Sequence, residues 1–197
     1  MKISHIAGAA AFMVTGFVSA AGAATTYDFT GGANPAGPFS LGCQATGLLN
    51  VDCEVTYNAE GLGVKGIPDL QPGEIDNWPK SQETLWVNFD YDVRLVDVTL
   101  RMFDYNDDFE LFINGSMDSS YGPGISDNPY TISPDINFVN SFGIRASSSS
   151  IVDGLILKDN FTLASFKVAP VPVPAAGFLL IGAMAALGAV GRRRKAG

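Results

Sequence analysis

Histidine is nearly absent from this chain. Its one histidine, His5, lies in an N-terminal segment that we expect to be removed, so the mature protein would have none. Serine–histidine–aspartate and cysteine–histidine catalysis need an imidazole, as do histidine-ligated zinc and iron sites, and these classes are therefore excluded. The sequence also lacks a nucleophile elbow, a phosphate-binding glycine loop and a dinucleotide-binding motif. We therefore expect a protein that is not an enzyme.

Basic residues are scarce between residues 25 and 169. This interval holds seven of the twelve Lys and Arg residues and all twenty Asp and Glu residues, a net charge of −13 within a chain of −8. So negative a charge repels the phosphate backbone of nucleic acids and argues against nucleic acid as a partner. A strongly negative charge is compatible with high solubility or with the binding of divalent cations. The interval of about 145 residues is long enough for one packed core.

Cysteine is scarce too, with only Cys43 and Cys53, ten positions apart. In an exported chain, where disulfides form and persist, this spacing predicts a local bridge. Closing so short a loop contributes about 2–3 kcal/mol in the chain-entropy picture, provided that the geometry permits the bond. A free thiol pair and a metal site are the alternatives.

Residues 1–24 have the three-part pattern of a secretory signal peptide. Lys2 supplies an early positive charge, an apolar stretch runs from about Ile6 to Val18, and small residues fill positions 19–24. Cleavage after Ala23 fits the preferred small-residue pattern, and cleavage after Ala24 fits nearly as well. The alternative is a retained N-terminal anchor, for which the apolar stretch is short.

The C-terminal segment, 170–197, contains a proline motif, an apolar run and a basic end. The apolar run at 175–191 has about 17 uncharged residues, the lower limit for a transmembrane helix. The positive-inside rule keeps a basic cluster after such a helix in the cytoplasm, which places the preceding domain outside. The motif consists of Val171, Pro172, Val173, Pro174, Ala175 and Ala176, and the basic cluster of Arg192, Arg193, Arg194 and Lys195.

This tail resembles the PEP-CTERM class of sorting tails, in particular its VPLPA variant, with Val173 where the variant has leucine. The resemblance covers residues 171–195. It implies a Gram-negative host that makes extracellular polysaccharide, and an exosortase, a membrane cysteine transpeptidase, that cuts near the proline motif. The protein would be held in the inner membrane before processing and would then reside at the cell surface or in a biofilm matrix. A plain C-terminal anchor is the alternative.

Between the two ends, apolar residues alternate with period two and no helical period persists. We predict strands over 85–90, 96–102, 109–113 and 136–144. Asn114-Gly115 predicts a two-residue hairpin turn, because both positions tolerate positive φ. In addition, the stretches 155–158 and 161–168 predict a closing hairpin across Asp159-Asn160.

Short strands separated by turn residues, in a chain with 22 glycines, predict an all-β domain over residues 25–169. Within this class we expect a β-sandwich of jelly-roll type. Residues 31–38 and 147–150 are expected to form loops. The predicted order is therefore a signal peptide, one β-sandwich ectodomain and a sorting tail with one transmembrane helix.

The densest acidic cluster lies between the second and third predicted strands. Asp104, Asn106 and Asp108 match the first three ligand positions of an EF-hand calcium loop. Phe109 stands in place of the required glycine and Gly115 in place of the bidentate glutamate, so the motif is not an EF-hand. An acidic β-turn and a calcium loop of another type are the two remaining interpretations.

A second acidic stretch, at 69–77, precedes the first predicted strand. Together with the sequence from 58 to 168, it resembles the ectodomains common among proteins with this sorting tail, which look like galactose-binding or carbohydrate-binding jelly rolls. In such modules a calcium ion often braces a loop through Asp or Glu side chains. The resemblance therefore implies structural Ca²⁺ as a cofactor. Its ligand candidates here are Asp76, Glu83, Asp69 and Glu60.

Sugar binding would also use aromatic side chains, whose large flat rings combine apolar area with a polar tip in Tyr and Trp. Trp86 alternates with Leu85 and Val87 along the strand, so it would lie on the opposite face; packing in the core or over a sheet edge is the alternative. The aromatic candidates are Trp78, Trp86, Tyr91, Tyr105 and Tyr121.

These observations predict a non-catalytic exported surface or matrix protein that associates with extracellular polysaccharide. Its partners would be the exosortase and that polysaccharide. The alternative is a secreted glycan hydrolase, which without histidine would have to use paired carboxylates such as Asp107 and Glu110.

Overall fold

The computed structural model describes residues 22–46, 52–66, 73–77, 82–122, 127–147, 151–152, 155–156 and 158–171. All of these belong to one unit, Gly22–Val171. The tail from Pro172 onward lies outside the described residues, as does the predicted signal peptide apart from its last three residues. Within the part of the chain that the structure describes, no helix is long and apolar enough to cross a membrane.

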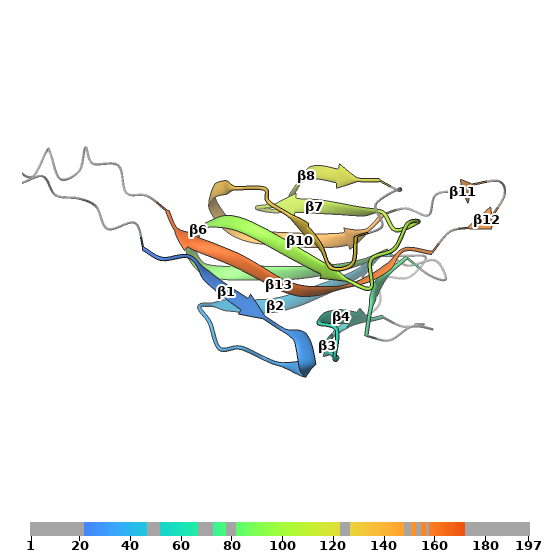
Figure 1. Ribbon diagram of the computed structural model, residues 1–197, viewed down its shortest axis with the longest axis horizontal. Helices are drawn as coiled ribbons and strands as arrows, with labels where there is room; N and C mark the ends of the chain where they lie inside the picture. Colours follow the sequence, from blue (N-terminus) through green and yellow to red (C-terminus); the bar gives the residue numbers. More distant parts are fainter. Residues whose placement is uncertain are drawn as a thin grey trace, which may run out of the picture. The chain divides into compact units, whose positions relative to one another are not determined.

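The described unit is all-β and antiparallel, as the alternating pattern predicts (Figure 1). The described residues contain no α-helix, and a 3-10 turn, η1 (Thr30–Gly32), follows the first strand. The strands are β1 (Thr25–Asp28), β2 (Phe39–Thr46), β3 (Glu54–Tyr57), β4 (Leu62–Lys65), β5 (Ile75–Asp76), β6 (Gln82–Arg101), β7 (Phe109–Ile113), β8 (Ser116–Tyr121), β9 (Tyr130–Ile132), β10 (Ile136–Ala146), β11 (Ile151–Val152), β12 (Leu155–Ile156) and β13 (Asn160–Pro170).

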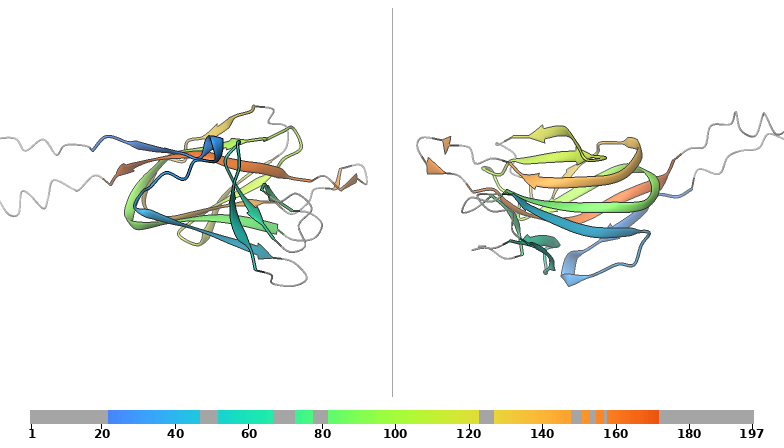
Figure 2. Two further views of the ribbon diagram at one scale, coloured as in Figure 1. Left: turned by 90° about the horizontal axis from the view of Figure 1, so that it is seen from below. Right: turned by 180° about the vertical axis from the view of Figure 1, so that it is seen from behind.

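The long strand β6 organises the sheet, because its two halves have different neighbours (Figure 2). Its first half lies between β2 and β10, and β10 continues to β7 and then β8. Its second half pairs with β13 and β9, and β13 also pairs with β1, β4 and β5. We call the strands around the first half the β10 group and those around the second half the β13 group. Among the strands of the described residues, eleven form one sheet, while β11 and β12 pair separately.

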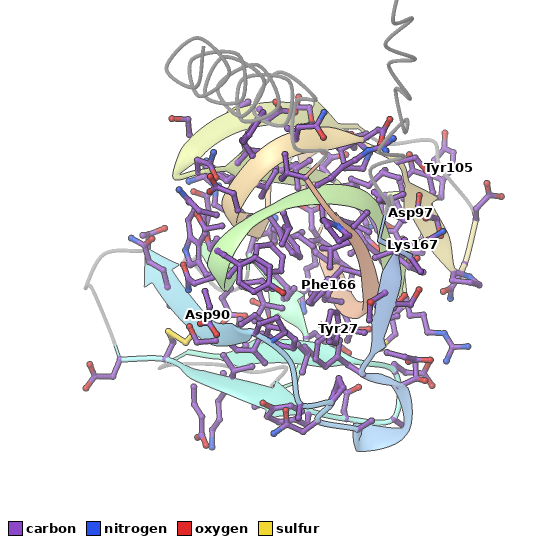
Figure 3. The ribbon with its side chains drawn as sticks, turned by 90° about the vertical axis from the view of Figure 1, so that its left-hand side faces the viewer. Tyr27, Asp90, Asp97, Tyr105, Phe166 and Lys167 are labelled. Carbon is purple, nitrogen blue, oxygen red and sulfur yellow. A yellow bond between two sulfur atoms is a disulfide. The ribbon has the colours of Figure 1, made fainter. Side chains whose placement is uncertain are left out.

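The apolar core joins the β10 group to the β13 group. Phe142 of β10 and Phe89 of β6 place their ring centroids 5.4 and 5.7 Å from that of Phe166 on β13. Tyr27 of β1 lies 5.1 Å from the same ring, and Figure 3 shows this pair. Because strands send alternate side chains to opposite faces, one face of each group supplies the core. The opposite face is the outer face.

Two predicted strands, 85–90 and 96–102, are one continuous strand. Exposed Tyr91 and Asp92 interrupt the apolar alternation between them, but buried Val93 and Leu95 resume it without a turn. The hairpin predicted at Asn114-Gly115 is confirmed: β7 and β8 pair across it, and φ is 51° at Asn114 and 79° at Gly115.

The closing hairpin predicted across Asp159-Asn160 is wrong. β12 pairs with β11, and β13 pairs with β6 over most of its length. Asp-Asn is a common turn dipeptide. Here, however, the Asp159 carboxylate accepts the N–H of Asp108, 51 positions away, so the dipeptide joins distant loops instead of reversing the chain.

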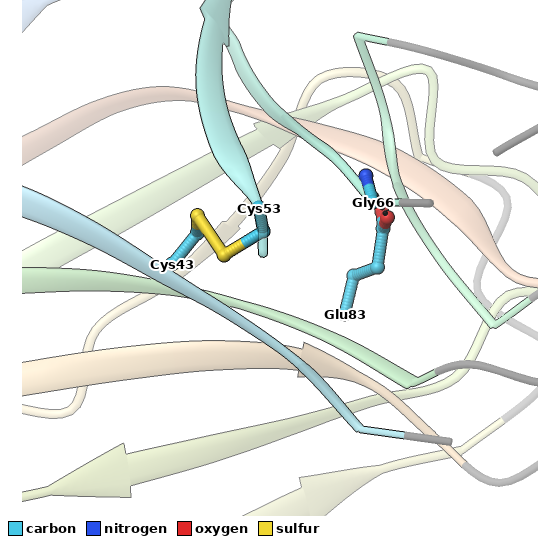
Figure 4. The surroundings of a disulfide bond; sticks show 4 residues. All are labelled: Cys43, Cys53, Gly66 and Glu83. Carbon is cyan, nitrogen blue, oxygen red and sulfur yellow. Dashed lines mark hydrogen bonds between the residues drawn. A yellow bond between two sulfur atoms is a disulfide. The ribbon is translucent and has the colours of Figure 1, made fainter. Parts of the chain in front are cut away.

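The predicted disulfide between Cys43 and Cys53 is confirmed, with 6.0 Å between the Cα atoms (Figure 4). It ties β2 to the residue before β3. In the same view, Glu83 Oε1 accepts a hydrogen bond from the Gly66 N–H, at 3.0 Å, just after β4. These two links attach the β3–β4 hairpin to β2 and β6.

Candidate functional site

Buried polar side chains gather at the end of the unit where β13 begins. Asp107 and Asp108 close the loop between β6 and β7, Asn77 follows β5, and Asp159 precedes β13. Asp107 and Asp159 have 0% of their surface exposed, and the other two have 8%. We call these four residues the carboxylate cluster. It brings together three segments that are far apart in the sequence.

Each oxygen of Asp107 and Asp159 accepts a hydrogen bond. Asp107 Oδ2 accepts the N–H of Asp104 at 2.7 Å, and its Oδ1 accepts that of Asn160 at 2.9 Å. Asp159 Oδ1 accepts the N–H of Asp108 at 3.1 Å, and its Oδ2 accepts Asn77 Nδ2 at 2.6 Å. Buried donors need such acceptors, so the two carboxyl groups act as braces between loops.

The two carboxyl groups also have raised pKa values. The pKa of Asp107 is raised to about 7, mainly by burial; the nearby carboxylates of Asp104 and Asp108 add to this effect, and the backbone hydrogen bonds from Asn160 and Asp104 oppose it. Burial raises the pKa of Asp159 to about 8, with the same pattern of smaller effects from neighbouring carboxylates. Both groups therefore change protonation near neutral pH. Perturbed pKa values are common at functional sites and also in structural networks.

The predicted metal ligands fall into two places. Asp76 on β5 and Glu83 on β6 are both buried, and the Asp76 N–H donates to Glu83 Oε2 at 3.2 Å. In the β6–β7 loop, Asp104 Oδ1 accepts the N–H of Asn106 at 3.1 Å, and Asn106 Nδ2 donates to the Lys158 carbonyl at 2.8 Å. Asp108, in the carboxylate cluster, lies at the end of the same loop.

Within the described ranges, no group of three or more His, Cys, Asp or Glu side chains is arranged to hold a metal ion. A calcium ion needs several oxygens pointing at one position, whereas the Asp104 Oδ1 atom and both Asp107 oxygens point at backbone N–H groups. The calcium site stays a prediction. Of the other two candidates, Asp69 lies outside the described residues, and Glu60 bonds to Arg101 at 3.2 Å.

On the outer face of the β10 group, Trp86 lies between two glycines. The strand register pairs Trp86 with Gly42 on β2 and with Gly143 on β10, and pairs Gly143 with Phe112 on β7. The half-buried indole lies 5.7 Å from the Phe112 ring at an interplanar angle of 62°. The predicted side of Trp86 is correct, because its neighbours Leu85 and Val87 are in the core.

The other aromatic candidates have different surroundings. Tyr121 stacks on Phe109 with centroids 4.5 Å apart, and Tyr105 is 70% exposed in the β6–β7 loop. Tyr91 is 58% exposed and, with Tyr27 and Pro170, lines a small cavity of about 80 Å³. Trp78 lies outside the described residues.

The second carboxylate of the proposed hydrolytic pair lies elsewhere, on the outer face. Glu110 Oε2 accepts Arg145 Nε at 2.6 Å and is also contacted by Arg145 Nη2. The Arg145 guanidinium carbon lies 4.6 Å from the Phe112 ring centroid, a cation–π distance. Glu110 is therefore held by an arginine, while Asp107 is buried.

Sequence reasoning missed Asp159, Asn77, Gly143 and Phe112 as site residues. Asp159 and Asn77 are 82 positions apart, so no local pattern links them. A signal for Gly143 does exist in the sequence, because a glycine inside a strand often marks a close approach of another group.

No protein-family model matches this chain, and no curated protein or solved structure matches it either.

Proposed function

We propose that the chain is an exported, non-catalytic surface or matrix protein that is sorted by an exosortase-type system and associates with extracellular polysaccharide. The observation that carries export is the Cys43–Cys53 disulfide, because such bonds persist in oxidising compartments outside the cytoplasm. The signal-peptide and sorting-tail patterns at the two ends of the sequence agree with it.

The positions of the first and last strands support the proposed domain boundaries. β1 begins at Thr25, directly after the proposed signal-peptide cleavage site, and β13 ends at Pro170, directly before the proline motif. Thr25 pairs with Val168, so the two ends of the folded part adjoin. Removal of either end segment would leave both strands whole.

Within the all-β fold, the proposal includes a β-sandwich of jelly-roll type. Its support is the core shared by the β10 and β13 groups, in which aromatic rings from both groups touch. The non-catalytic assignment is supported by the surroundings of Asp107 and Glu110. Both oxygens of Asp107 accept backbone N–H groups, and Glu110 is bound by Arg145, so neither carboxyl group is available to a sugar as an acid or a nucleophile.

Sorting is tested by expressing the full chain in a Gram-negative host with and without an exosortase. We expect release of the protein only with the enzyme, and retention in the membrane when both Pro172→Ala and Pro174→Ala are present. Pro35→Ala, in the loop before β2, is the matched control and should be released normally. Normal release of the double variant would reduce the tail to a simple anchor.

Association with polysaccharide is tested by affinity electrophoresis of the full chain in gels that contain matrix polysaccharide from the host. We expect retarded migration of the protein and no shortening of the glycan on prolonged incubation. Unchanged migration would exclude the association, and cleavage that depends on Asp107 and Glu110 would replace it with hydrolysis.

A further inference from the structure

The outer face of the β10 group carries a cross-strand row with large aromatic residues next to glycines. Neighbouring strands place its members side by side, and strand alternation puts them on the face away from the core. The row runs Gly42, Trp86, Gly143, Phe112 and Met117, across β2, β6, β10, β7 and β8.

The Trp86 indole lies flat on β10. A Cβ atom at Gly143 would be 2.6 Å from Cζ3, 2.7 Å from Cε3 and 2.9 Å from Cη2 of the indole. Three adjacent ring atoms come this close together only when the face of the ring, and not its edge, covers the glycine. The opposite face of the indole therefore points away from the sheet, which agrees with its half-buried state.

The other neighbour, Gly42, leaves open space beside the indole. A Cβ atom there would meet only Asn88 Nδ2 at 3.8 Å and Trp86 Cβ at 3.9 Å, which are ordinary contacts. Neither the backbone nor the packing thus requires glycine at position 42. Its effect is to keep the surface low on the β2 side of Trp86.

Polar side chains border this flat ring. Asn88 follows Trp86 by two positions, and Arg145 follows Gly143 by two, so both lie on the same outer face. Glu110 holds Arg145 beside Phe112. A sugar ring has C–H groups on its faces and hydroxyl groups around its edge, which suits a flat aromatic surface with donors and acceptors at its rim.

The charge of the protein indicates whether this face would bind a neutral or an acidic polysaccharide. Arg145 and Glu110 neutralise each other on this face, and the interval 25–169 has a net charge of −13, which repels polyanions. From these observations we infer that the outer face of the β10 group binds a neutral polysaccharide, with one sugar ring stacked on the outward face of Trp86. The inference rests on the proposed association with polysaccharide and specifies its surface and its ligand class.

The test measures binding of the full chain to a soluble neutral glucan, a neutral galactan and alginate, an acidic polysaccharide, by affinity electrophoresis and calorimetry. We expect binding to at least one neutral glycan and weaker binding to alginate. Trp86→Ala should weaken the neutral binding about tenfold or more, as expected for a central aromatic anchor. Trp86→Tyr, which keeps a flat ring, should retain part of it.

Gly42→Val keeps the test decisive if Trp86→Ala fails to fold. A β-branched residue suits a strand, and the Cβ has space, so this variant should melt like the wild type while its methyl groups cover the approach to the indole. We expect it to lose neutral-glycan binding. Tyr57→Ala, which removes an exposed aromatic on β3, is the matched control and should bind normally.

Each remaining result overturns the inference in a distinct way. Unchanged binding by folded Gly42→Val and Trp86→Ala would place the sugar elsewhere and leave the proposed function standing. Loss of binding in Tyr91→Ala alone would place the sugar in the small cavity that Tyr91 lines with Tyr27 and Pro170. Preference for alginate would contradict the neutral ligand, and binding of an acidic host matrix polysaccharide without binding of either neutral glycan would do the same. No binding to any polysaccharide, the host's included, would overturn the proposed function as well.

Discussion

The carboxylate cluster and the outer face of the β10 group both bring together side chains from distant strands, but they differ in access to water. In the cluster, Asp107 and Asp159 are fully buried, and their oxygens are occupied by protein donors. On the outer face, Trp86 is half-buried, and the adjacent Gly42 leaves space. The acidic side chains of the cluster brace the fold. The surface suited to a ligand is instead the outer face, where a glycine leaves space beside an aromatic ring.

The largest effect of a single substitution is expected from breaking the cluster. Asp159→Ala leaves the N–H of Asp108 and the amide of Asn77 buried without this acceptor, and should lower the free energy of unfolding by about 2–4 kcal/mol. Chemical denaturation measures the loss. Asp135→Asn removes the exposed charge bound to Arg94 and keeps a residue that tolerates the φ of 53° at this position, so it is the control and should cost under about 1 kcal/mol. Equal effects of the two changes would contradict the bracing role.

Titration of the cluster should make stability depend on pH. Between the usual pKa near 4 and the raised values of about 7 and about 8, the folded protein keeps protons on Asp107 and Asp159 that the unfolded chain releases. The free energy of unfolding should therefore fall as pH rises from 5 to 8, by on the order of 6 kcal/mol for the two groups together, and then level off.

The measurement is a series of urea denaturations in buffer with chelator, and the double variant Asp107→Asn with Asp159→Asn should show a flatter profile. Stability that rises from pH 5 to 8 in the wild type would contradict the raised pKa values. Repeating the series with Ca²⁺ tests the predicted calcium loop at Asp104, Asn106 and Asp108, because an ion bound there, beside Asp107 and Asp159, would favour their charged forms and oppose the decline.

The two glycines beside Trp86 should respond differently to the same change. Gly143→Ala places a Cβ 2.6 Å from the indole and should cost about 1–2 kcal/mol as the ring is displaced, while Gly42→Ala should stay within about 0.5 kcal/mol of the wild type. Thermal melting and the fluorescence of the indole report both effects. Equal stability of the two variants would mean that the indole does not lie on β10.

The smallest expected effect is a difference in coupling energy between two ion pairs that differ in exposure to solvent. Arg145 and Glu110 have side chains 27% and 15% exposed, against 38% and 53% for Arg94 and Asp135. Double-mutant cycles should give a coupling energy of about 1 kcal/mol for the first pair and about half of that or less for the second. A stronger coupling in the more exposed pair would contradict the expected order of the two coupling energies.

Sequence patterns predicted the β-rich character of the domain, the β7–β8 hairpin and the disulfide, because each depends on residues that are close in the chain. They missed β3 and β4, whose four residues each are too few for a periodic signal. They also divided β6 at Tyr91 and Asp92, because an exposed pair inside a strand resembles a turn. The Asp159-Asn160 hairpin failed for the opposite reason, since a local turn preference was overridden by a distant hydrogen bond.

By itself, the sequence determined which side chains alternate along a strand, and hence that Trp86 faces away from Leu85 and Val87. It also determined the low histidine content and the acidic charge of the domain. Only the tertiary structure decided that Trp86 would lie between Gly42 and Gly143, and that Asp107 and Asp159 would be buried together. The reason is that period two assigns a face to each side chain, whereas the register between strands selects its neighbours.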